Sequence, residues 1–152
     1  MTRAISRATA DAVGAATAQD APAYDRAAGE LAVAGSPEQV GLVLGAVLRM
    51  LLEEAHPDGL AGEDAQVILV RCAGSAAGWF SGLDVAVLLL VLTGALGLHQ
   101  PAEEAAPVDP AAVTRHAPLL VADLLAVTGR PLRGYLDLAL AEIAIAETME
   151  LP

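Results

Sequence analysis

One stretch of the chain, residues 85–98, holds 14 consecutive residues without a charged side chain. As an α-helix it would be about 21 Å long, whereas the hydrocarbon core of a bilayer is about 30 Å thick. Apolar runs of this length are typical of buried core helices. We therefore expect a central apolar helix at about 84–98. Extending the run back to Trp79 reaches spanning length but includes Asp84, and a membrane-associated bundle built on 79–98 is kept as an alternative.

Helix-start signals recur along the chain. Ser36-Pro37-Glu38-Gln39 combines an N-cap serine, a proline at the first helical position and a glutamine that can complete a capping box. Asp109-Pro110 repeats the cap-then-proline pattern. Apolar residues then follow at spacings of three and four, which indicates amphipathic helices.

The fold class predicted from these patterns is all-α, a single-domain bundle of five to seven helices. A chain of 152 residues fits one domain. Residues 1–21 are rich in alanine and threonine with little apolar bulk, so we expect a flexible or frayed N-terminal arm, followed by a helical domain over 22–152. Residues 66–72 and 136–140 show strand-like features, but continuation of the first and strong helix formers in the second favour helices.

Charge is strongly asymmetric. Eight arginines stand against nineteen acidic residues, with no lysine, for a net charge of −11. Binding to a phosphate backbone depends on clustered cations, so nucleic acid is not an expected partner. An acidic surface is attracted to basic surfaces, and a basic protein partner fits this chain.

A single cysteine, Cys72, cannot form an internal disulfide. We therefore expect a reducing, cytoplasmic setting, with Cys72 as a small buried apolar side chain.

Residues suited to catalysis are few. The histidines His56, His99 and His116 lie far apart, and no nucleophile–base motif surrounds them. Glu53 and His56 form one Glu-x-x-His, but helical di-iron sites use that motif twice. We expect no enzymatic activity, no metal and no cofactor.

Two features are candidates for binding a partner or ligand. Trp79 and Phe80 lie at a predicted helix junction, where aromatic side chains either anchor a partner or cover the end of the core. Arg130 and Arg133 lie at the start of the last predicted helix, where they would hold an anion or pair with the chain's own acids.

Glycines recur at spacings of three or four within predicted helices, in the pairs 41/45, 74/78 and 94/97. Such spacing suggests close approach between helices, within the chain or between two copies. The expected function is that of an acidic helical interaction module that forms a homo-oligomer, most simply a homodimer, or binds a protein partner. The alternatives are a small-molecule binder or enzyme with an apolar pocket between helices, and the membrane-associated bundle.

Overall fold

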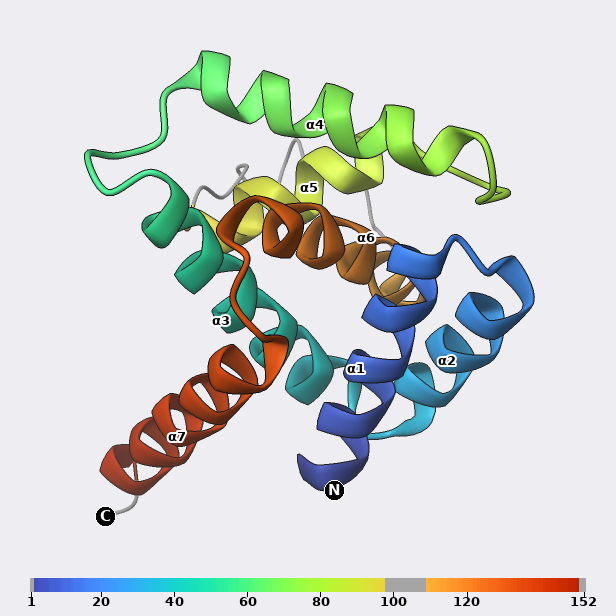
Figure 1. Ribbon diagram of the computed structural model, residues 1–152. Helices are drawn as coiled ribbons and strands as arrows, with labels where there is room; N and C mark the ends of the chain where they lie inside the picture. The colour runs from blue at the N-terminus through green and yellow to red at the C-terminus, as the bar shows by residue number, and fades with distance from the viewer. Residues whose placement is uncertain (1, 98–108, 151–152) are drawn as a thin grey trace.

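Seven α-helices and no strands make up the part of the chain that the computed structural model describes, residues 2–97 and 109–150. The all-α, single-domain bundle is therefore confirmed (Figure 1). The helices are α1 (Thr2–Ala18), α2 (Ala21–Val33), α3 (Pro37–Ala55), α4 (Gly62–Ala77), α5 (Val85–Ala95), α6 (Pro110–Thr128) and α7 (Leu132–Glu150).

The helix starts follow the expected capping chemistry. Ser36 caps α3, with the full capping box to Gln39 and Pro37 in the first turn. Asp109 caps α6 by accepting a hydrogen bond from the N–H of Ala111. These side chains satisfy backbone donors that the helix leaves free, and so fix where each helix begins.

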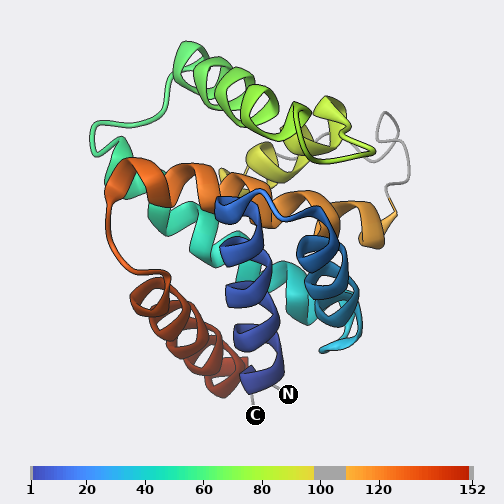
Figure 2. The same ribbon diagram turned by 45° about the vertical axis from the view of Figure 1, so that its right-hand side comes forward.

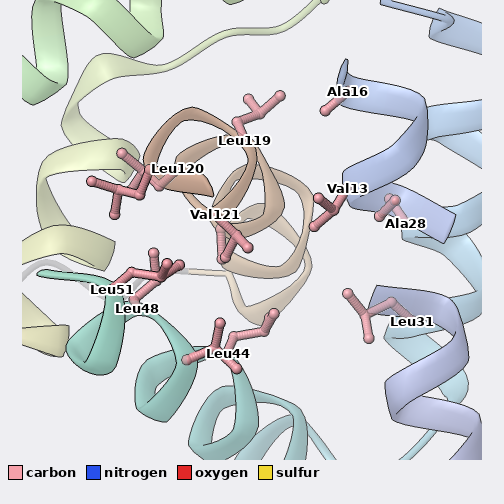
Figure 3. Packing of buried hydrophobic residues seen from close by; sticks show 14 of the residues in the cluster. Val13, Ala16, Ala28, Leu31, Leu44, Leu48, Leu51, Leu119, Leu120 and Val121 are labelled. Carbon is pink, nitrogen blue, oxygen red and sulfur yellow. The ribbon is translucent and has the colours of Figure 1, made fainter. Parts of the chain in front are cut away.

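The central position belongs to α6 rather than to residues 84–98. α6 contacts α1, α2, α3, α4 and α5, and eight of its residues are buried. In Figure 3, Leu119, Leu120 and Val121 leave α6 in three directions, with Val121 toward Leu44 of α3. The predicted central helix does form over Val85–Ala95, but it lies to one side, and Leu89 remains 45% exposed.

The N-terminal residues differ from the flexible or frayed arm expected from the sequence. α1 packs against α2 and α6 (Figure 2). Its inward face buries Ile5, Ala12 and Val13. The small side chains that suggested weak anchoring instead let α1 approach its neighbours closely, because alanines leave little bulk between two helices.

α4 exposes two apolar residues that recur at helical spacing along it. Val67 and Val70 are exposed, whereas Ile68, Cys72 and Ala76 form the buried side. Both sets recur at helical spacing, so periodicity alone does not decide which one faces inward.

Only one helix of the described residues is long and apolar enough to cross a membrane as a single helix, and it is the buried core helix α6. α2 and α3 pass the same test only as a pair bent by 119°. Of the segment 79–98 proposed as an alternative membrane span, residues 79–97 are described, and their helix covers Val85–Ala95, which is too short to cross.

Candidate functional site

The predicted Trp79–Phe80 pair belongs to an aromatic cluster at the junction of α2, α4 and α6. The rings of Tyr24, Trp79 and Phe80 meet edge to face, with centroids 5.4–5.7 Å apart. The Arg115 guanidinium lies 4.7 Å from the centroid of the Phe80 ring. Phe80 is buried in this cluster, whereas Trp79 stays partly exposed. Of the pair, only Trp79 can therefore meet a ligand without rearrangement.

Polar groups within the cluster are occupied by structural hydrogen bonds. The Tyr24 hydroxyl donates to the Arg115 carbonyl oxygen at 2.5 Å. His116 Nε2 accepts from the N–H of Asp84 and Nδ1 lies 2.8 Å from the Ala112 carbonyl, so these partners assign the proton to Nδ1. Through these two contacts, His116 ties the start of α5 to α6. Burial also raises the pKa of the Tyr24 hydroxyl above its usual value.

A cleft of about 430 Å³ opens beside this cluster, between the end of α1, α4 and the second half of α6. We call it the α1–α4–α6 cleft. It brings two of the predicted site residues, Trp79 and Arg130, to one place. Its remaining lining residues are Ala16, Thr17, Gln19, Cys72, Ser75, Ala76, Leu119, Ala122, Asp123, Leu125, Ala126 and Gly129.

Both charged residues of the cleft are paired with residues outside its lining. The Asp123 carboxylate is 10% exposed and is held by the Arg71 guanidinium, whose Nε and Nη2 donate to it at 2.7–3.0 Å. Arg130 Nη1 lies 2.8 Å from Glu54 Oε1. The lining is consequently close to neutral, with the polar groups of Thr17, Gln19 and Ser75 among apolar walls.

Cys72 forms part of the buried wall of the cleft. Burial, together with the nearby Asp123 carboxylate, raises the pKa of its thiol to about 12. The nucleophilic form of cysteine is the thiolate, so this cysteine is chemically quiet at neutral pH.

Arg130 and Arg133, which the sequence groups together, have different surroundings. Arg130 lines the cleft, while Arg133 lies exposed in the first turn of α7 and is absent from the cleft lining. Within residues 2–97 and 109–150, the ion pairs include Arg130 but not Arg133.

A second hollow, of about 710 Å³, lies between α3, the end of α5 and α7. We call it the α3–α5–α7 groove. Its walls include four of the paired glycines, Gly41, Gly45, Gly94 and Gly97. A methyl group added at any of these four would meet no neighbouring atom within 4 Å. Within the described part of one chain, the expected close approach at these glycines is therefore wrong, since no described residue packs against them.

The outer face of α7 carries a row of apolar side chains: Leu138, Ala141, Ile145 and Met149. Leu138, Ile145 and Met149 are 61%, 62% and 81% exposed. A second face of α7 buries Tyr135, Leu136 and Ala139. α7 is thus apolar on two sides, and only one of them has a partner among residues 2–97 and 109–150.

No group of three or more potential metal-ligating side chains occurs in the described parts of the chain. Glu53 is paired with Arg49, and His56 ends α3 with Nδ1 3.9 Å from Asp64 Oδ2. His99 lies outside the described residues.

Sequence reasoning missed Gln19, Asp123 and Ser75 as cleft residues. They come from three helices that are distant in the chain, so no local motif could connect them. No sequence signal marks Gln19 either, because the sequence predicts no helix end within residues 1–21.

Comparison with protein-family models, curated proteins and solved structures finds no match to this chain.

Proposed function

We propose that this protein is a non-enzymatic interaction module that forms a two-fold homodimer through the outer face of α7. The observation that carries the proposal is the exposure of Leu138, Ile145 and Met149 in one row on a helix whose other face is already buried. A surface helix in a monomer usually has one apolar face, and a second one favours contact with another molecule.

The pattern of side-chain sizes on this face favours a second copy of the chain. In an antiparallel pairing centred near Ala141, Leu138 of one copy lies opposite Ile145 of the other. The same register places Met149 opposite Gly134, where an added methyl group would meet no neighbour. Met149 thus faces a small residue on each side of the dyad, and Leu138 and Ile145 form apolar pairs between the copies. A two-fold contact uses one patch twice.

The charge beside the centre of the outer face is already neutralised within each copy. Glu142, close to the dyad, is already paired with Arg49 at 2.5 Å, which reduces the repulsion between the two Glu142 carboxylates.

The expected setting is the cytoplasm, which the single buried thiol of Cys72 supports. A basic protein partner remains the competing occupant of the outer face, because the net charge of −11 attracts basic surfaces.

The experiment compares self-association of the wild type with that of Ile145→Glu by sedimentation velocity across micromolar concentrations. We expect the wild type to dimerise and the variant to associate at least about 100-fold more weakly, because the dimer loses two apolar contacts of about 1.5–3 kcal/mol each. Circular dichroism should show unchanged helicity, since Ile145 is exposed.

Val70→Glu is the matched control. Val70 is 66% exposed on α4, which lies on the opposite side of α6 from α7 in Figures 1 and 2. This variant should dimerise like the wild type. A wild type that stays monomeric throughout, or a Val70→Glu variant that dissociates as readily as Ile145→Glu, would contradict the proposal.

A further inference from the structure

We propose that the α1–α4–α6 cleft is a binding site for an uncharged aromatic molecule that carries at least one hydrogen-bonding group. The cleft lies away from the outer face of α7, and the inference is independent of dimerisation. Its volume of about 430 Å³ falls within the roughly 300–1,000 Å³ of small-molecule sites.

The electrostatics of the lining favour an uncharged molecule. Asp123 is neutralised by Arg71 and Arg130 by Glu54, both from outside the cleft. A charged ligand would have to break one of these pairs or be buried without a partner, and both cost free energy. An anion would also meet the repulsion of a chain with a net charge of −11.

The walls favour a planar aromatic group. Small side chains, among them Ala16, Ala76, Ala122 and Ala126, leave the cleft open along α6. Trp79 forms part of one wall, and its indole is fixed by edge-to-face contacts with Tyr24 and Phe80. A ring seated there would meet a preorganised aromatic surface.

Gln19 supplies an independent indication that the cleft is used. It occupies a left-handed backbone conformation, with φ of 55°, at the end of α1. The N–H groups of Gln19 and Asp20 bond the carbonyls of Ala16 and Ala15, a helix end at which glycine is the usual residue. The other helix end that borders the cleft does carry glycine, Gly129, with φ of 72°.

Gln19 therefore places a side chain at a left-handed position where glycine would be less strained. That side chain lines the cleft, and its amide offers both a donor and an acceptor. We assign Gln19 as the residue that hydrogen-bonds the ligand.

Trp79 makes the test direct, because it is the only tryptophan of the chain and it lines the cleft. The probe is N-phenyl-1-naphthylamine, an uncharged aromatic amine with one N–H donor, and binding is followed by quenching of Trp79 emission. The matched probe is the 8-sulfonate of the same molecule. We expect saturable quenching by the neutral probe and at least tenfold weaker binding of the sulfonate.

Two variants locate the binding. Ser75→Phe places a large ring at the exposed edge of the cleft and should abolish quenching. Val70→Phe, on the same helix but outside the cleft lining, should bind the probe like the wild type. Ile145→Glu should also bind normally, which separates the cleft from the outer face of α7.

Gln19→Gly separates a binding role from a structural one. Glycine relieves the left-handed strain, so the variant should melt at a higher temperature than the wild type. It should bind the neutral probe about three- to tenfold more weakly, as expected for loss of one hydrogen bond. Absence of saturable quenching in the wild type, full binding by Ser75→Phe or by Gln19→Gly, or equal affinity for the sulfonate would overturn the proposal.

Discussion

At the scale of single residues, the polar side chains at the helix junctions have structural partners rather than reactive surroundings, whereas the buried Thr9 hydroxyl has no hydrogen-bond partner among the described residues. His116 links the start of α5 to α6, and Tyr24 donates to a backbone carbonyl of α6. The charged side chains of Asp123 and Arg130 are likewise paired. Each of these residues holds two helices together, which is why the chain keeps polar groups near its core.

The raised pKa of Cys72 makes stability depend on alkaline pH. The folded thiol titrates near 12, whereas the thiol of the unfolded chain titrates near its usual 9.0. Between these values the unfolded chain releases a proton that the folded chain keeps, so the free energy of unfolding falls by up to roughly 1.4 kcal/mol per pH unit. The stabilisation is complete below about pH 9 and declines as the pH rises through 12.

Urea denaturation at pH 8 and pH 10 measures this effect in the wild type and in Cys72→Ala. We expect the wild type to lose more stability between the two pH values than the variant does. Tyr24, whose pKa is also raised by burial, should leave a residual decline in the variant. Equal losses in both proteins would show that Cys72 does not contribute.

At the scale of helices, the open space around the glycines of α3 has a consequence for stability. Gly41 and Gly45 lie inside α3, and a methyl group at either position would meet no neighbour. Replacing either with alanine should stabilise the fold by about 0.5–1 kcal/mol, because alanine loses less conformational freedom in a helix. Urea denaturation provides the measurement.

Gly35→Ala serves as the contrast for these substitutions. An added methyl group there would lie 2.9 Å from Ile5 Cδ1 and 3.1 Å from Gln39 Oε1, which accepts the capping-box hydrogen bond from Ser36, so this variant should not gain the stability expected of Gly41→Ala. Dimerisation of Gly41→Ala and Gly45→Ala should match the wild type if the outer face of α7 forms the interface. Loss of dimerisation would instead point to the glycines of the α3–α5–α7 groove.

The helices themselves were largely predictable, because their signals are local. The Ser36 cap and the Asp109-Pro110 pair mark the starts of α3 and α6 in the sequence and in the structure. The alternation at 136–140, a feature expected of strands, arises because α7 is apolar on two faces: Leu136 is buried while Leu138 is exposed. A period of two can thus appear in a helix with a second apolar face.

The arrangement of the helices, and with it the cleft, could not be read from the sequence. Which side of α4 turns inward depends on what it meets, and there Ile68 is buried while Val67 is exposed. The central place of α6 likewise depends on tertiary packing, because the five helices that precede it in the chain all contact it. Trp79 was identified from its place at a junction, whereas Gln19 and Asp123 reach the cleft only through tertiary packing.

At the scale of the whole molecule, the net charge of −11 distinguishes the two possible occupants of the outer face of α7. Two copies of this chain repel each other, and raising the salt concentration from 0.1 to 1 M shortens the screening length from about 10 to about 3 Å. We expect the dimer to tighten several-fold over that range.

Sedimentation equilibrium at the two salt concentrations measures this dependence. A complex with a basic protein would respond in the opposite way, because screening weakens attraction between unlike charges. A dimer that dissociates as salt rises would contradict an interface built on the apolar outer face. It would point instead to contacts between opposite charges.

The packing of α1 against α6 also bears on how the chain is made. During synthesis α1 leaves the ribosome before α6, and the residues between Ala18 and Pro110 take roughly 5 to 20 s to add. Throughout that interval Ile5 and Val13 lack their final surroundings on α6. A nascent chain of this protein must therefore shield its early helices, by pairing α1 with α2 or by engaging a chaperone, until the helix that completes their burial has emerged.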